Sequence, residues 1–238
     1  MKILALETSA KAVSVAVAEN DTIITSRFAN EGETHSVTMM PMLDEMLREA
    51  GLTVRDMELI AVSNGPGSFT GLRIGVSAAK GLAWTLDVPC CGVSTLDAMA
   101  QNALDFEGLV IGAMDARRSQ IYNALFLCHD GKLQRLTEDR AIGLDVLLPE
   151  MEKYSDLPKL VVGDGAVLCY TYLSENNIAC KMLDGERGLQ NARGVAHAAY
   201  EMALRGQTVS ARDLTPVYLR LSQAERERLA RGLPITLD

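Results

Sequence analysis

Residues 64–84, NGPGSFTGLRIGVSAAKGLAW, lead from a glycine-rich turn into a stretch of small residues with helical periodicity. A phosphate-binding loop of the Walker type needs Gly-x4-Gly-Lys-Ser/Thr, and no Lys-Ser/Thr pair follows these glycines. Glycine inside a helix costs about 1 kcal/mol relative to alanine, so Gly71 and Gly75 need a structural reason. We therefore expect their side of the helix to lie close to another backbone, either the protein's own sheet or the helix of a partner.

Three lines of residues run along this predicted helix. The first is Gly71, Gly75, Ala78 and Leu82, the second is Leu72, Val76, Ala79 and Ala83, and the third is Arg73, Ser77, Lys80 and Trp84. The third line is expected to face solvent, because it carries the charges. Trp and Arg anchors are typical of adaptable interfaces, so the residues leave open whether the second line belongs to the core or to a contact between molecules.

The segments on either side alternate between strand and helix patterns. KILALETS, AVSVAVAEN and DTIITSRFAN predict a three-stranded meander, and residues 36–50 predict a helix with a broad methionine-rich stripe, ended by Gly51. That stripe is wider than one packing contact requires. LIAVSNG and PCCGVST predict buried strands before and after the glycine-rich helix.

The same order of elements recurs about a hundred residues later. LVIGAMDARRSQIYNALFLCHDGKLQRL predicts three strands, a helix is expected near residues 145–153, and KLVVGDGAV predicts another strand. The pattern indicates an α/β protein of two duplicated βββαβα units, the two-lobed architecture of actin-like ATPases and sugar kinases, although periodicity alone also allows a generic α/β pair. We expect lobes at residues 1–106 and 107–238, the second ending in a helix over 191–206 and a charged tail helix.

Composition restricts the possible functions. The formal net charge of −8 argues against a protein that holds a nucleic-acid backbone by itself, so an RNA substrate would require a basic partner. Glu7 interrupts the N-terminal apolar run too early for a signal peptide or a membrane span, which favours a cytoplasmic protein. The five cysteines include no CxxC pair, so neither a disulfide framework nor a zinc ribbon is indicated, and most are expected to be core thiols.

The glycine-rich segment, together with LALETSAKAVSVAVAE and HSVTMMPMLDEML, closely resembles the TsaB (YeaZ) family. MDARRSQIYNALF and PVYLR extend the resemblance into the second half. The resemblance implies the actin-like fold and a non-catalytic role beside TsaD, the subunit that transfers threonylcarbamoyl to the adenosine 3′ of the anticodon in tRNAs reading codons that begin with A. It also implies TsaE as a further partner, contact with tRNA only through the complex, and no membrane.

The resemblance implies that the first two helices form the partner surface. Carried over residue by residue, that surface comprises Met39, Met42, Leu43, Met46, Leu72, Arg73, Val76, Ala79, Lys80 and Ala83. The same helices could also form a homodimer. The balance between the two assemblies stays open.

Catalytic residues are not expected in this chain. The catalytic relative should carry an HxxxH pair on a helix, which brings two imidazoles to one metal, but this sequence has only His35, His129 and His197. We therefore expect neither a metal nor a cofactor, and a metalloprotease is disfavoured for the same reason. A stand-alone actin-like kinase or ATP-dependent carbamoyl-transfer enzyme is the alternative.

A nucleotide would bind at the turns between the first two strands of each lobe. The first turn offers Glu7, Thr8 and Ser9 and the second offers Asp115 and Arg117, but neither contains a glycine that would let phosphate approach the backbone. We prefer a structural role for Asp115 and Arg117, as an ion pair across the cleft between the lobes.

Overall fold

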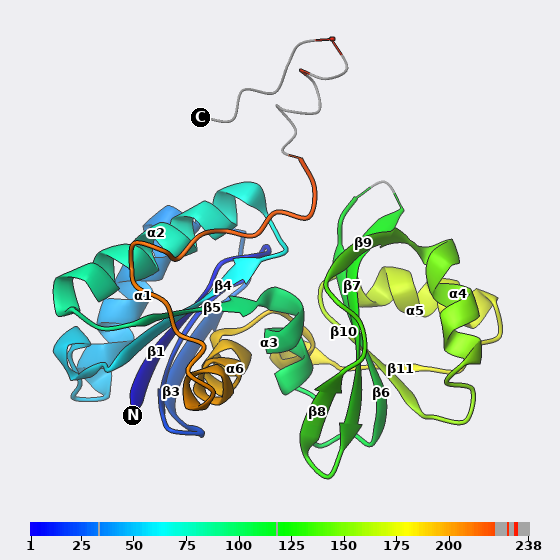
Figure 1. The fold of residues 1–238 in the computed structure, drawn as a ribbon, viewed down its shortest axis with the longest axis horizontal. Helices are drawn as coiled ribbons and strands as arrows, with labels where there is room; N and C mark the ends of the chain where they lie inside the picture. Colours follow the sequence, from blue (N-terminus) through cyan, green and yellow to red (C-terminus); the bar gives the residue numbers. More distant parts are fainter. Residues whose placement is uncertain (33, 118, 222–227, 229–230, 233–238) are drawn as a thin grey trace.

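The computed structural model describes all residues except 33, 118, 222–227, 229–230 and 233–238, and it consists of two α/β lobes side by side (Figure 1). The charged tail helix expected after residue 213 falls mainly on residues outside this description. No helix among the described residues combines the length and the apolar character that crossing a membrane requires.

The first lobe is a five-stranded sheet in the order β3-β2-β1-β4-β5. Its elements are β1 (Lys2–Glu7), β2 (Val13–Glu19), β3 (Thr22–Ala29), α1 (His35–Glu49), η1 (Val54–Asp56), β4 (Leu59–Gly65), α2 (Phe69–Leu86), β5 (Cys90–Ser94) and α3 (Thr95–Gln101). The first three strands pair antiparallel, and β4 and β5 run parallel to β1. The predicted meander, glycine-rich helix and flanking strands are all confirmed.

The second lobe repeats this topology with the strand order β11-β10-β6-β7-β8. Its elements are β6 (Gly108–Asp115), β7 (Gln120–His129), β8 (Lys132–Arg135), β9 (Arg140–Gly143), α4 (Leu144–Glu152), β10 (Lys159–Val162), α5 (Ala166–Glu175), β11 (Lys181–Met182), η2 (Gly185–Gly188) and α6 (Ala192–Leu204). In each copy the first strand (β1 or β6) lies at the centre of the sheet, the second and third strands extend from one side of it, and the two strands that follow the next helices (β4 and β5, or β10 and β11) extend from the other side. The additional strand β9 pairs with β7. The duplication is therefore confirmed. The first copy extends the expected βββαβα unit by β5 and α3, and the second extends it by β9, β11 and α6.

Both faces of the first sheet are covered by helices, because successive residues of its strands point to opposite faces and both sets are apolar. Leu4 and Leu6 of β1 point into the core beneath α1 and α2, whereas Ile3 and Ala5 point to the opposite face. That opposite face is covered by the small residues of α6, among them Val195 and Ala196. Every β1 residue after Lys2 is consequently buried.

The last helix does not belong to the lobe in which the sequence places it. Although α6 follows the second sheet, it packs against β1, β2 and β5 of the first, and α3 lies beside it between the two sheets (Figure 1). Assigning everything after residue 107 to the second lobe is therefore wrong for α6 and for the segment that follows. The physical reason is that only a helix on its far face can cover Ile3 and Ala5 of the first sheet.

Residues 208–221, which we call the strap, continue along the first lobe after α6. Val209 exchanges two backbone hydrogen bonds with Cys90 at the edge of β5, and Ala211 and Leu214 are buried in the core beneath α2. The strap then follows α2 back toward its N-terminus (Figure 1).

All five cysteines are free thiols, and Cys90, Cys91, Cys128 and Cys169 are buried. Burial raises the pKa of Cys91 and of Cys169 to about 12, because it disfavours the thiolate. The expectation that most of the cysteines are core thiols is confirmed.

Candidate functional site

The glycine line of α2 packs against the protein's own first lobe. A Cβ at Gly71 would collide with the backbone carbonyl of Thr8, and one at Gly75 would collide with the Thr8 hydroxyl. The Thr8 Oγ1 in turn donates a hydrogen bond of 2.8 Å to the Gly71 carbonyl, and Ser68 caps the helix. Of the two explanations for these glycines, the structure supports close approach within the chain.

Most of the expected partner-surface residues lie in the core instead. The exposed fraction is 3% or less for Met39, Leu43, Met46, Leu72, Val76, Ala79 and Ala83. These seven cannot form a surface in this fold, so their assignment is corrected. The broad apolar stripes arise because each helix covers the sheet and also contacts its neighbouring helix.

The outward sides of α1 and α2 nevertheless carry apolar side chains. Val37 and Met40 of α1 are 68% and 42% exposed, and Trp84 of α2 is 73% exposed. Met42, Ile74 and Ala78 are half-buried at the margin of the core. Together with Arg73 and Lys80, these residues form the candidate docking face, and the prediction that the Arg73–Trp84 line is the outer one is correct.

Arg73 and Lys80 of the docking face are held by the strap. The Lys80 ammonium donates hydrogen bonds to the carbonyls of Arg212 and Leu214, at 3.0 and 2.9 Å. The Arg73 guanidinium lies 4.1 Å from the centre of the Phe69 ring and donates to the Tyr218 hydroxyl at 3.2 Å.

A cleft of about 700 Å³ separates the two lobes beside the N-terminus of α2. It is lined by the link between β1 and β2, the turn before α2, the turn between β6 and β7, and the end of the strap. Of the residues expected at a nucleotide, Ser9, Asp115 and Arg117 line this cleft. Glu7 and Thr8 are fully buried behind its wall.

Asp115 and Arg117 do not form the expected ion pair across the cleft. Both belong to the β6–β7 turn, and the Asp115 carboxylate accepts a hydrogen bond of 2.7 Å from the backbone N–H of Arg117. Arg117 has a left-handed backbone conformation, with a φ of +63°. The hydrogen bond from its N–H to the Asp115 carboxylate stabilises the tight turn that contains it. The expectation fails because the two residues face the cleft from the same side.

Glu7 is a fully buried carboxyl at the end of β1. It accepts hydrogen bonds from the backbone N–H of Ser9, at 2.6 Å, and from the Ser63 hydroxyl on β4. Burial nevertheless raises its pKa above the ordinary value, because these two bonds offset only part of the desolvation. Glu7 thus fixes the β1–β2 link from behind and offers no group to a ligand in the cleft.

A charged cluster joins α3 of the first lobe to the second lobe. Arg135 of β8 contacts Asp97 of α3 at 2.9 Å and Asp139 at 2.7 Å, and its guanidinium lies over the Phe126 ring. The Ser94 hydroxyl donates a further bond of 2.7 Å to Asp139. These contacts connect α3 to the second sheet, and no sequence pattern indicated them.

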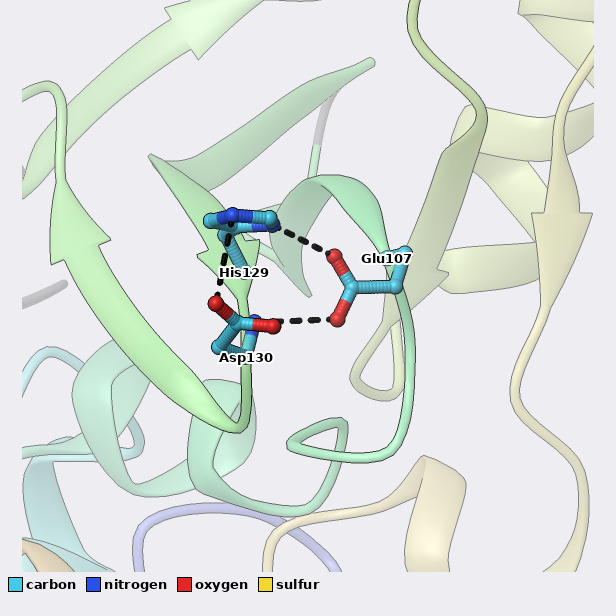
Figure 2. A group of neighbouring side chains, drawn as sticks. All are labelled: Glu107, His129 and Asp130. Atoms are coloured by element: carbon cyan, nitrogen blue, oxygen red, sulfur yellow. Dashed lines mark hydrogen bonds and ion pairs between the residues drawn. The ribbon is translucent and has the colours of Figure 1, made fainter.

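A histidine and two acids form a second cluster, where the connection from α3 enters β6 (Figure 2). Glu107 accepts from His129 Nδ1 at 2.8 Å and from the backbone N–H of Asp130 at 2.9 Å, and His129 Nε2 lies 3.4 Å from Asp130. The pKa of His129 is raised by its hydrogen bond to Glu107 and by the charges of both acids. The three groups, all exposed, satisfy one another and pin the lobe connection to the β7–β8 hairpin.

The strap supplies residues that sequence reasoning missed. The Tyr218 ring stacks on Phe69 with centroids 4.5 Å apart, and Arg220 donates a hydrogen bond of 2.5 Å to the carbonyl of Ala116 in the β6–β7 turn. PVYLR (residues 216–220) was the signal available. Only its place in the fold reveals what it contacts.

Comparison with known proteins places the chain among tRNA-modification proteins. The family model described as TsaD, tRNA N6-adenosine threonylcarbamoyltransferase, matches residues 24–211. The protein named tRNA threonylcarbamoyladenosine biosynthesis protein TsaB from Bacillus subtilis is 36% identical, over 94% of this chain and 96% of its own length. Its namesake from Escherichia coli is 33% identical, over 92% and 95%.

Solved structures agree with this similarity. A Pseudomonas aeruginosa protein described as uncharacterized with similarity to peptidase YEAZ superposes with a TM-score of 0.79 at 28% identity, over 92% of this chain and 99% of its own. Component A of (R)-2-hydroxyglutaryl-CoA dehydratase from Acidaminococcus fermentans has a TM-score of 0.50 at 12% identity, over 86% and 99%, and shares the fold alone. The two-lobed, actin-like architecture expected from the duplicated pattern is thus confirmed.

Proposed function

This chain belongs to the TsaB family, and from that premise we propose that it is a non-catalytic subunit that binds TsaD and is required for threonylcarbamoyl transfer to tRNA. The observation that carries the proposal is the similarity to curated TsaB proteins over more than nine-tenths of the chain. TsaE is the further partner, and the complex acts in the cytoplasm.

The proposed docking face is the outward side of α1 and α2. Exposed apolar side chains on neighbouring helices favour a protein partner, and Trp84 and Arg73 are residue types that anchor interfaces. This face replaces the seven buried residues to which the family resemblance pointed, and it keeps Met42, Arg73 and Lys80.

The chemistry of the chain favours an accessory role. Three histidines with no HxxxH spacing do not supply the metal-binding pair expected of the catalytic subunit. The buried Glu7 offers no carboxylate to a metal–nucleotide complex in the cleft. With a net charge of −8, the chain should bind tRNA weakly by itself, and the basic surface should come from the partner.

Co-elution with TsaD from the same organism tests the assembly. Wild type should form a complex in size-exclusion chromatography and should restore threonylcarbamoyladenosine formation in a reconstituted reaction. Val37→Asp on α1 and Trp84→Ala on α2 should each weaken the complex at least tenfold, because both side chains are exposed on the docking face. Val167→Asp is the matched control, since Val167 is 66% exposed on α5 of the other lobe.

A stand-alone actin-like enzyme is the second candidate, favoured only by the cleft and by the Asp115 and Lys11 side chains that line it. It predicts metal-dependent ATP turnover by the isolated chain. If the isolated chain hydrolyses ATP, loses that activity in Asp115→Asn and does not bind TsaD, the enzyme replaces the accessory subunit as the proposed function. Self-association that persists with TsaD present, and that Val37→Asp disrupts, would instead assign the docking face to a homodimer.

A further inference from the structure

The strap connects the docking face to the cleft between the lobes. At one end its carbonyls hold Lys80, in its middle Tyr218 contacts Phe69 and Arg73, and near its end Arg220 binds the carbonyl of Ala116 on the second lobe. The strap is also built into the first lobe, because the Val217 N–H donates to the Asn64 carbonyl at 2.7 Å.

Gly65 marks how closely the strap must approach. A side chain there would collide with the carbonyl of Val217, and its φ of +140° is one that other residues rarely adopt. The glycine-rich turn before α2 therefore holds the strap on one side, while Gly67 receives the backbone of Ser9 on the other. One turn joins the strap, α2 and the β1–β2 link at the edge of the cleft.

The cations of the docking face are consequently not independent of the strap. A partner carboxylate that binds Arg73 side-on takes its Nε–H together with one Nη–H, and it then competes with the Tyr218 hydroxyl for the Nε–H as the stronger acceptor. A partner that takes Arg73 therefore weakens one contact that holds Tyr218. Tyr218 lies two residues from Arg220, which carries the bond to the second lobe.

We propose that the strap couples partner docking on α2 to the cleft: a partner that engages Arg73 loosens Tyr218, and with it the hold of Arg220 on the β6–β7 turn. This rests on the proposed function, because it regulates the same docking face. Coupling of this kind is reciprocal. Whatever weakens the strap's hold on the second lobe must therefore also favour partner binding.

Hydrogen exchange of the free chain tests the strap without any partner. Arg220→Ala should raise amide exchange severalfold in residues 114–121, where the Ala116 N–H donates to Gln120 within the turn. Arg212→Ala is the matched control, because it removes a positive charge from the strap while the contact to Lys80 uses only its backbone carbonyl. Equal exchange in Arg220→Ala and wild type would overturn the structural half of the proposal.

Titration with TsaD tests the coupling. Docking on wild type should raise exchange in residues 114–121, and Arg220→Ala should remove that response. Arg220→Ala and Tyr218→Phe, which keeps the ring stack but loses the hydroxyl, should each bind TsaD about threefold or more tightly, whereas Arg212→Ala should match wild type.

Binding that is normal in all four proteins, with no change in the turn, would overturn the coupling alone. A wild type that does not bind TsaD would overturn the proposed function and the coupling with it.

Discussion

At the scale of single residues, a tight steric constraint lies where α2 crosses Thr8. Gly75→Ala places a methyl group against the Thr8 hydroxyl and close to Val62, in a site with no free space, and should lower the free energy of unfolding by about 1–3 kcal/mol. Gly81→Ala, in the same helix but with nothing within 4 Å, should raise it by about 0.5–1 kcal/mol. Urea denaturation of the pair gives both values. Equal effects would mean that helix propensity, not close approach, decides both positions.

Glu7 makes stability depend on pH. Burial raises the pKa of Glu7 in the folded state above the ordinary glutamate value of 4.5. Between these two pKa values the folded chain keeps a proton that the unfolded chain releases. The stabilisation is therefore complete below the ordinary value and is lost as the pH rises through the raised pKa. Glu7→Gln should flatten this fall, because a neutral amide keeps an acceptor for the Ser9 N–H without a charge to desolvate. Urea midpoints at pH 5 and pH 8 measure the slope, and an unchanged slope in Glu7→Gln would assign it to another group.

At the scale of elements, α2 has an inner and an outer side, and charge should distinguish them. Ala79→Arg forces a cation into a fully buried position with no partner and should cost more than about 3 kcal/mol of unfolding free energy. Ser77→Arg is exposed on the same helix and should change it by less than about 0.5 kcal/mol. Thermal unfolding compares the two. A stable, well-folded Ala79→Arg would mean that the line of Leu72, Val76, Ala79 and Ala83 lies on the surface after all.

Helical periodicity predicted α1 and α2 well but could not say how many neighbours each helix has. A stripe such as that of Met39, Leu43 and Met46 looks broader than a single contact needs, and the surplus suggested a partner. In the fold, the same stripe contacts both the sheet and the adjacent helix, so the surplus is used internally. The order of elements along the chain and their duplication were readable from the sequence, because turns and alternation are local signals. The strap, the Arg135 cluster and the return of α6 depend on contacts between distant segments, which no local pattern encodes.

At the scale of the whole molecule, the lobes are tied together by charge as well as by packing. Arg135→Met keeps an unbranched apolar side chain but removes the guanidinium from the Phe126 ring and leaves Asp97 and Asp139 without their cation. The side chains of Arg135 and Asp97 are 25% and 36% exposed, so solvent screens part of the loss, and we expect a cost of about 1–2 kcal/mol.

A double-mutant cycle with Asp97→Asn isolates the contribution of that pair to the unfolding free energy. Arg48→Met is the control, because Arg48 faces Glu45 at 3.9 Å on an exposed side of α1 and should matter little. If Arg135→Met and Asp97→Asn prove additive, the two residues act independently and the cluster is not a link between the lobes.

The position of α6 also determines when the first lobe can finish folding. Ile3 and Ala5 are made at the start of synthesis, but the helix that covers their side of the sheet begins only at Ala192. On the ribosome, at about 5–20 residues per second, that apolar sheet face must wait roughly ten seconds or more for its cover. During this interval the nascent chain presents a hydrophobic surface to chaperones and to other nascent chains, so a chain cut before residue 192 should aggregate even though all five strands of its first sheet are present.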